Sequence, residues 1–158
     1  MQTIITQNFQ ATRKLGRELA KKIKAGQIIC LSGDLGSGKT TLAQGLLKGL
    51  GAKGPYTSPT FLIIKNYKKE IPISKSQFPN KSKIQNPKSK TLNIYHIDVY
   101  RVNEKDILNL GWEEIIKDKN NIIVIEWAER IKKIIPAGAK WIKFSWEGEK
   151  KRKINLHF

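Results

Sequence analysis

The chain has 158 residues, the size of one domain with a single core, and a net charge of +17 from 30 Lys and Arg against 13 Asp and Glu. So basic a chain can attract nucleic acid, an anionic membrane or an acidic protein, although most of its charges are lysines, which commonly mark a solvated surface. The single cysteine, Cys30, excludes an internal disulfide and a multi-cysteine metal site. No charged segment followed by an apolar run begins the chain and no window is apolar enough to span a bilayer, so we expect no signal peptide, no membrane segment and a cytoplasmic location.

The first part of the chain predicts two strands and two helices. We expect an edge strand at residues 3–6 and a helix from about Asn8 to Ala25, with apolar residues four apart on one face and Gly26 as its end. A short apolar strand follows at Ile28 to Leu31. A second helix is predicted over Thr41 to Leu50, with leucines on one stripe.

The loop between that strand and that helix, Gly33 to Thr40, fits the phosphate-binding pattern of a Gly, four residues, then Gly-Lys-Ser/Thr. Glycines allow left-handed backbone conformations, so that successive N–H groups point at phosphate oxygens. Lys39 would reach the outer phosphates, and Thr40 would offer its hydroxyl to a bridging Mg²⁺. The helix would direct its positive N-terminal end at the phosphates. We therefore predict a nucleotide site formed by Gly33, Leu35, Gly36, Ser37, Gly38, Lys39, Thr40 and Thr41.

Glycines at 49, 51 and 54 are expected to break regular structure and to lead into a segment, Thr57 to Thr60, that contains two hydroxyl residues. In GTPases and related ATPases a mobile segment at this place senses the γ-phosphate through a hydroxyl, which Ser58 or Thr60 would supply. Taken alone, Ser-Pro-Thr is also an ordinary turn. A strand is predicted over Phe61 to Tyr67.

Residues 68–92 differ in composition from the rest of the chain. They contain seven lysines, four serines and three prolines against a single acid, Glu70, and Lys-Ser-Lys occurs twice. Such a segment has too little apolar surface to pack. We expect one domain over residues 1–158 with a disordered insertion at about 68–92.

The second half of the chain alternates strands and short helices. Its most apolar strand, Ile122 to Ile125, has the composition of a strand at the centre of a parallel sheet. Strands alternating with helices after a phosphate-binding loop predict an α/β fold, a three-layer α/β/α sandwich with an antiparallel edge made by the last two strands. The elements expected here are strands at Leu92 to Asp98, Lys140 to Ser145 and Arg152 to His157, and helices at Asn103 to Asn109, Trp112 to Lys117 and Ala128 to Ile134.

Carboxylates at strand ends are the first candidates for metal and catalysis, because ligands of α/β sheets bind beyond the C-terminal ends of the strands. Glu126 follows four apolar residues, the Walker B arrangement, and would hold the Mg²⁺ shell or orient the attacking water. Asp98 ends the neighbouring strand and would do the same. The alternative is that either carboxylate caps a loop or pairs with Arg101 or Arg130.

Two further residues near these carboxylates have structural interpretations. A lone strand histidine such as His96 is usually structural, and the spacing of Trp127 favours the core over stacking on a base.

The guanine-specific Asn-Lys-x-Asp signature is incomplete, because Lys83 stands where its aspartate is needed. The sequence therefore favours ATP over GTP.

Four blocks, in this order, resemble the TsaE family, formerly YjeE, of small bacterial P-loop ATPases. The blocks are the loop ending Gly-Lys-Thr-Thr, Ser58 to Phe61, His96 to Arg101, and Ile125 to Arg130. The resemblance that they carry extends over about residues 8–136. The resemblance implies ATP and Mg²⁺ at the loop, with Thr40, Asp98 and Glu126 serving the metal and hydrolysis and the Ser-Pro-Thr block acting as a switch. It also implies that Trp127 belongs to the nucleotide site.

The resemblance further implies a role in making threonylcarbamoyladenosine (t6A) in tRNA. Family members act with TsaB and TsaD, and TsaD transfers the threonylcarbamoyl group to the adenosine beside the anticodon. The ATP cycle of the TsaE component would reset or license the complex, and tRNA would be met through that complex. The lysine-rich insertion departs from the family, whose members usually connect the two strands by a short segment.

Two other functions compete with this one. A small P-loop kinase acting on a nucleoside or metabolite would need a lid with phosphate-clamping arginines, and the five arginines of the chain are not clustered in such a lid. A non-catalytic basic RNA-binding module would need interleaved aromatic residues or an RNA-binding motif, and the sequence has neither.

The composition of the insertion generates a first prediction. Replacing residues 70–90 with a short Gly-Ser turn should leave the melting temperature and the ATP affinity nearly unchanged, because this segment offers little apolar area to offset an ordering cost of about 1–2 kcal/mol per residue. At most, association with an anionic partner should weaken at low salt, where exposed charges are poorly screened. Thermal unfolding and nucleotide titration test this prediction, and a large fall in melting temperature would contradict it.

Overall fold

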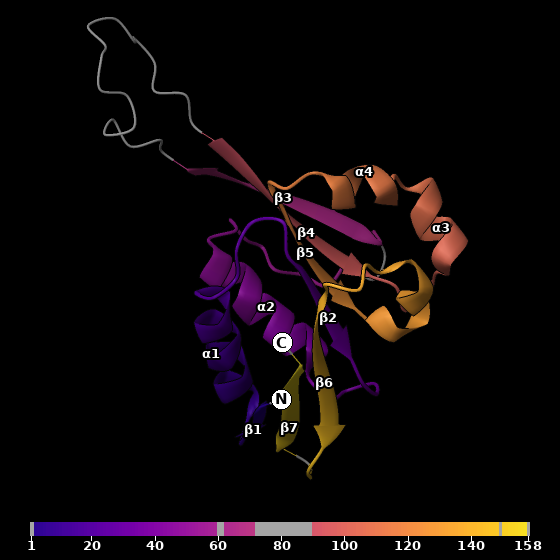
Figure 1. Cartoon of the computed structure of the whole chain (residues 1–158). Coiled ribbons are helices and arrows are strands. Elements are labelled where there is room, and N and C mark those ends of the chain that lie inside the picture. The colour runs from indigo at the N-terminus through magenta and orange to yellow at the C-terminus, as the bar shows by residue number, and fades with distance from the viewer. Residues whose placement is uncertain (1, 60–61, 72–89, 149, 158) are drawn as a thin grey trace, which may run out of the picture.

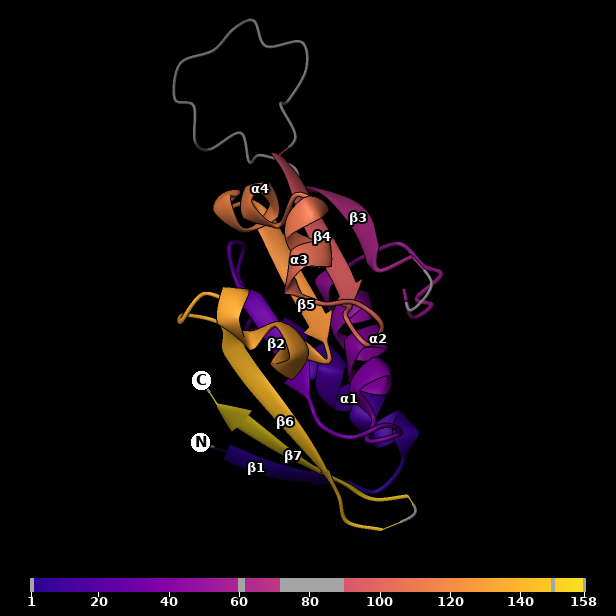
Figure 2. The same ribbon diagram turned by 90° about the vertical axis from the view of Figure 1, so that its right-hand side faces the viewer.

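The computed structural model describes residues 2–59, 62–71, 90–148 and 150–157 of the chain, and they form a seven-stranded sheet with helices on both faces (Figures 1 and 2). The strand order is β1-β7-β6-β2-β5-β4-β3. The strands are β1 (Gln2–Thr6), β2 (Ile28–Ser32), β3 (Ile64–Ile71), β4 (Lys90–Asp98), β5 (Asn121–Glu126), β6 (Lys140–Trp146) and β7 (Arg152–His157).

The four central strands β6, β2, β5 and β4 are parallel, while β3 at one edge and β7 and β1 at the other pair antiparallel to their neighbours. Every residue of β2 and β5 is buried, which explains their continuous β-branched and apolar sequences. The predicted parallel centre and antiparallel edge are confirmed.

Two helical layers cover the sheet, so that the predicted three-layer architecture is also confirmed (Figure 1). On one face, α1 (Phe9–Ala20) and α2 (Lys39–Leu50) cover a core that includes Leu31, Leu46 and Phe144. The other face is covered by three shorter elements, α3 (Glu104–Asn109), α4 (Trp112–Lys117) and the 3₁₀ helix η2 (Ala128–Ile134). Burial raises the pKa of the Cys30 thiol in this second core to about 12, so the thiol stays protonated.

Several element boundaries differ from the sequence-based expectation. The first helix ends at Ala20 and not at Ala25, because the chain turns at residues 21–26 to bring the N–H of Gly26 to the carbonyl of Asn121, 2.7 Å away. Residues 128–134, where a helix was expected, form a 3₁₀ helix with non-helical angles at Ile131.

The predicted insertion is too wide at both ends. Residues 68–71 belong to β3 and residues 90–92 to β4, and they pair in register, with Lys68 opposite Asn93 and Ile71 opposite Lys90. Backbone hydrogen bonds form this pairing irrespective of the lysine-rich composition. The expectation of disorder applies to residues 72–89, which lie outside the described residues.

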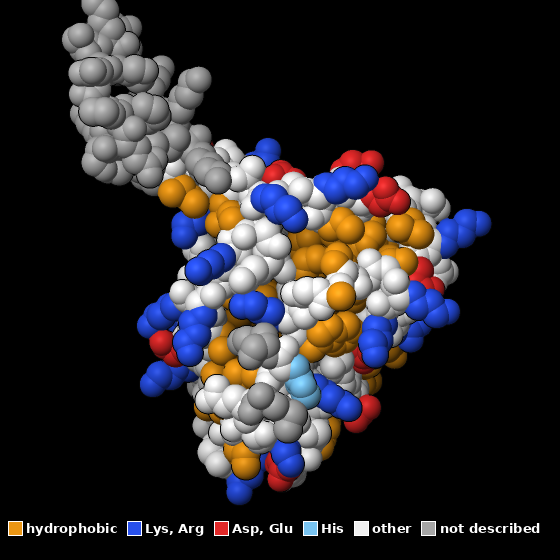
Figure 3. All heavy atoms as spheres, in the orientation of Figure 1, with side chains coloured by type: hydrophobic (Ala, Val, Ile, Leu, Met, Phe, Trp, Pro, Cys, Tyr) orange, Lys and Arg blue, Asp and Glu red, His pale blue; other side chains and the backbone are white. Residues whose placement is uncertain are grey.

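Basic side chains are spread over the face of the described residues that Figure 3 shows. On the face seen in Figure 3, Lys and Arg side chains are distributed around the periphery and are not gathered into one patch, and hydrophobic groups reach the surface between them. No helix among the described residues is long and apolar enough to cross a bilayer.

Glycines allow α1 and α2 to pack with their backbones in contact. The second helix ends at Leu50 as predicted, before Gly51 in a left-handed conformation, whereas Gly49, one of the glycines expected to break regular structure, is helical. A Cβ atom at Gly45 would meet the carbonyl oxygen of Arg13 and lie 3.0 Å from the Cα of Gly16. The close approach of the two helices therefore requires glycine at this position.

We predict that Gly45→Ala destabilises the protein by about 2 kcal/mol or more, since the overpacking of two backbones outweighs the helix propensity of about 1 kcal/mol that alanine adds. Urea unfolding monitored by circular dichroism measures the change. Gly138→Ala is the matched control, because nothing lies within 4 Å of a Cβ atom there, and it should alter stability by less than about 0.5 kcal/mol. Equal stability of the two variants would contradict the role of Gly45.

Candidate nucleotide-binding site

The C-terminal ends of β2, β5 and β4 meet at one edge of the sheet, and the candidate site lies there. Leu31 of β2 pairs with Glu126 of β5, which in turn pairs with Asp98 of β4. The loop from Gly33 to Gly38 leaves β2 at this edge and leads into α2. The fold thus brings the predicted loop and both predicted carboxylates together.

The loop itself is shaped by positive backbone angles. Gly33 has φ +133°, and a Cβ atom there would lie 2.6 Å from the carbonyl oxygen of Phe144 on β6, so no other residue fits. The N–H of Gly33 donates to the Glu129 carboxylate, 3.3 Å away. Ser37 is wholly buried, whereas Leu35 is 71% exposed, so only the backbone of Leu35 faces the loop interior. Thr41 is half-buried in the first turn of α2.

Lys39 is folded back over the loop that precedes it. Its Nζ donates to the carbonyl oxygens of Gly33 and Asp34, at 2.6 and 2.8 Å, and lies 3.4 Å from the centre of the Trp127 ring. Burial lowers the pKa of the Lys39 ammonium, and the carboxylates of Glu129 and Glu126 oppose this shift. The charged group is therefore held by two neutral carbonyl oxygens and a ring face, which phosphate oxygens of opposite charge could replace.

Trp127 has φ +62°, a left-handed conformation that is unusual for a bulky residue. The turn follows β5 directly and places the indole against Lys39 and against the ring of Tyr100, 4.7 Å between centroids. Trp127 also packs partly against the second core, as its spacing led us to expect, while its contact with Lys39 places it beside the candidate site.

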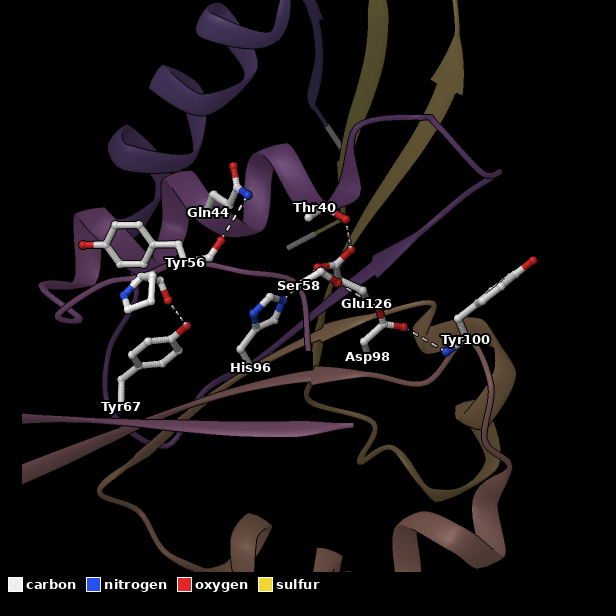
Figure 4. Close-up of polar contacts among 10 residues, drawn as sticks. Thr40, Gln44, Tyr56, Ser58, Tyr67, His96, Asp98, Tyr100 and Glu126 are labelled. Carbon is white, nitrogen blue, oxygen red and sulfur yellow. Dashed lines mark hydrogen bonds and ion pairs between the residues drawn. The ribbon is translucent and has the colours of Figure 1, made fainter. Parts of the chain in front are cut away.

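Glu126 is fully buried and contacts polar groups from two other elements (Figure 4). Its Oε2 accepts from the Thr40 hydroxyl at 2.5 Å, and its Oε1 lies 2.8 Å from Nε2 of His96. The Nδ1 atom of His96 is buried without a partner among the described residues. Sequence reasoning gave His96 only a structural role and did not include it among the site residues; the pairing of β4 with β5 brings it to Glu126.

Asp98, the second carboxylate of the site, contacts the segment before β3. Its Oδ2 accepts from the Ser58 hydroxyl at 3.1 Å and its Oδ1 from the N–H of Tyr100 at 3.0 Å (Figure 4). Thr60, predicted to bind nucleotide with Ser58, lies outside the described residues.

The oxygen groups at this edge fit a magnesium ion that arrives with a nucleotide. Mg²⁺ prefers hard oxygen ligands and in such sites takes one or two carboxylates, with phosphates and water completing its shell. Thr40, Asp98 and Glu126 supply one hydroxyl and two carboxylates. Within the described part of the chain no three His, Cys, Asp or Glu side chains are grouped to hold a metal ion without such a ligand.

Comparison with known proteins points to one family. The family model described as "Threonylcarbamoyl adenosine biosynthesis protein TsaE" matches residues 6–154. The tRNA threonylcarbamoyladenosine biosynthesis protein TsaE of Nostoc sp. is 37% identical over 83% of this chain and 70% of its own length. The protein of the same name from Bacillus subtilis is 32% identical over 96% of this chain and 82% of its own length. The crystal structure of B. subtilis YdiB superposes with a TM-score of 0.70 at 27% identity, covering 98% of this chain and 83% of that one.

Proposed function

The chain belongs to the TsaE family of proteins of tRNA threonylcarbamoyladenosine biosynthesis, and we propose that it serves this pathway as a Mg²⁺-dependent ATPase acting with TsaB and TsaD. The observation that carries the proposal is the contact between Thr40 of the loop and Glu126 of β5. It joins the phosphate-binding loop to a Walker B carboxylate, the pairing on which P-loop ATPases depend. A cytoplasmic location, where tRNA is modified, follows from the same proposal.

Binding begins with an exchange of partners at Lys39. The ammonium leaves the carbonyl oxygens of Gly33 and Asp34 and binds the outer phosphate oxygens, while backbone N–H groups of the loop bind the inner ones. Both partner sets are polar, so the ammonium is never left buried without one. Trp127 limits the access of water to the outer phosphate.

Glu126 and Asp98 then have distinct roles. Mg²⁺, when bound, neutralises charge between the outer phosphates, and Thr40 and Asp98 would hold it. Glu126, fixed on one side by His96, would orient the attacking water through its carboxylate. His96 is a positioning residue in this scheme, because it acts through Glu126.

Ser58 would couple this chemistry to the partner proteins. Its hydroxyl contacts Asp98, so a change in the phosphate or metal near Asp98 would release or hold the segment that contains Ser58. A segment that changes with nucleotide state is suited to signal the ATP cycle to a complex. We propose that TsaB and TsaD read this signal and that tRNA is reached through them.

The first test of this proposal is Lys39→Ala. We expect loss of measurable ATP binding in calorimetry, with the circular dichroism spectrum preserved, because the side chain contacts polar loop atoms and one ring and is not part of the hydrophobic core. Lys48→Ala, an exposed lysine in the last turn of α2, is the control and should bind ATP as the wild type does. Wild-type affinity in Lys39→Ala would remove the loop from the mechanism.

The second test separates binding from hydrolysis. Glu126→Gln keeps the shape of the side chain and an oxygen that accepts from Thr40, but it loses the charge that orients water. ATP should still bind, while phosphate release, measured with TsaB, TsaD and tRNA present, should fall by at least about tenfold. Glu114→Gln, an exposed carboxylate on α4, is the control. If turnover is unchanged in Glu126→Gln, catalysis has to be assigned to another group, with Asp98 the first candidate.

A further inference from the structure

Residues 53–58, which lie between α2 and β3, form neither a helix nor a strand. Residues 53–57 make no backbone-to-backbone hydrogen bond with any other part of the chain that the structure describes. A segment without such bonds takes its position from side chains of other elements that bond to it. Four side chains do so here, and they are Gln44 of α2, Lys65 and Tyr67 of β3, and Asp98 of β4.

Lys65 bonds to this segment at two points. Its Nζ donates to the carbonyl oxygen of Pro55 at 2.9 Å and to the hydroxyl of Thr57 at 3.2 Å. The ammonium also lies 5.2 Å from the centre of the Tyr67 ring, and the buried Tyr67 donates its own hydroxyl to the Pro55 carbonyl at 3.1 Å (Figure 4). Strand β3 therefore holds both Pro55 and Thr57.

Gln44 holds the residue between these two. Its Nε2 donates to the carbonyl oxygen of Tyr56 at 3.1 Å (Figure 4), and its Oε1 accepts from Nη2 of Arg13 at 2.7 Å. Because a guanidinium only donates, the amide oxygen of Gln44 faces Arg13 and the amide nitrogen faces Tyr56. Arg13 belongs to α1, so the first two helices together fix the position of Tyr56.

The residue that follows these three reaches the candidate site. The hydroxyl of Ser58 donates to Oδ2 of Asp98 at 3.1 Å. Consecutive Cα atoms lie about 3.8 Å apart, so a fixed Thr57 restricts Ser58 to a small volume beside Asp98. The bonds to residues 55–57 therefore determine whether the Ser58 hydroxyl lies within reach of the carboxylate.

The pairing of β3 with β4 places Lys65 on the face of the sheet that carries the catalytic candidates. Lys65 pairs with His96, and directly paired residues of antiparallel strands project from the same face. His96 in turn contacts Glu126. The segment and the buried carboxylate are thus supported from adjacent positions of two neighbouring strands.

The surroundings of Lys65 differ from those of a lysine that serves only to solvate the surface. Its side chain is half-buried, and ordering so long a side chain costs rotamer entropy. No carboxylate of the described residues forms an ion pair with its ammonium, whose two hydrogen bonds both go to neutral oxygens of the segment. Hydrogen bonds from a charged donor are about twice as strong as neutral ones, which suits a group that holds a segment in place.

We propose that Lys65 is a positioning residue for ATP hydrolysis, which together with Gln44 and Tyr67 holds residues 55–57 so that Ser58 stays at Asp98. This inference rests on the proposed ATPase and identifies the side chains that keep its responsive segment in place. Both hydrogen bonds of Lys65 go to the segment and neither goes to the phosphate-binding loop. Lys65 therefore affects turnover through Ser58 and leaves the affinity for ATP unchanged.

The test measures phosphate release with TsaB, TsaD and tRNA present, and ATP binding by calorimetry. Lys65→Met keeps an unbranched side chain but removes the ammonium. Turnover should fall about five- to fiftyfold, while the dissociation constant of ATP should change by less than about twofold. Lys65→Arg, whose guanidinium can donate to both oxygens, should recover most of the turnover. Lys68→Met, a change at an exposed lysine of the same strand, is the matched control and should behave as the wild type does.

A double variant separates a positioning role from a merely structural one. Ser58→Ala should slow turnover by itself, and the addition of Lys65→Met should slow it no further, because both changes remove the same contact with Asp98.

Four results would overturn the inference and leave the proposed ATPase intact. They are wild-type turnover in Lys65→Met, equal losses of turnover and ATP affinity in that variant, wild-type turnover in Ser58→Ala, and losses that add in the double variant. If the wild-type protein does not hydrolyse ATP with its proposed partners, the proposed function is wrong and the inference is wrong with it.

Discussion

The buried carboxylate of Glu126 is the constraint on which the arrangement of the site depends. A carboxylate out of contact with water is strongly unfavourable unless donors surround it. Here the donors come from the start of α2, through Thr40, and from the adjacent strand, through His96. Both elements must therefore be in place before Glu126 can be buried, which ties the phosphate-binding loop to the centre of the sheet.

Lys39 lies among several carboxylates, including Glu126 and Asp98. Carboxylates from β4, β5, η2 and the loop lie near one ammonium group, and that ammonium is bound by carbonyl oxygens and an aromatic face. Excess negative charge around a single ammonium, itself held by neutral groups, is consistent with the proposed ligand, which would bring both phosphate and a divalent cation. Family membership, loop geometry and the charge of the site are three separate observations, and each is consistent with the proposed function.

Local patterns in the sequence predicted much of the fold. The loop with its flanking strand and helix, the apolar strand β5 and the capping of α3 by Asn103 all follow from periodicity and from residue types with fixed conformational preferences. The end of α1 was predicted wrongly because helical periodicity continues past Ala20 while a tertiary hydrogen bond at Gly26 requires a turn. Gly49 was grouped with the glycines that break regular structure, but it lies inside α2 and lets this helix touch α1.

The parts of the site that could not be predicted are contacts between strands. His96 lies 30 residues from Glu126 in the sequence, and only the register of β4 on β5 brings the two side chains together. Sequence patterns identify residues whose side chains could take part in chemistry, whereas the register of the strands decides which of these side chains contact one another.

The geometry of β4 separates two ends of the molecule. Asp98 ends this strand at the site, and Lys90 begins it beside Ile71, eight residue steps or roughly 25 Å away at about 3.3 Å per step. The two residues between which the insertion lies, Ile71 and Lys90, are therefore at the end of the β3–β4 pair opposite the site. A change in the length of this connection therefore acts far from the site, and a fluorophore attached there would report on encounters with other molecules without contacting the site residues.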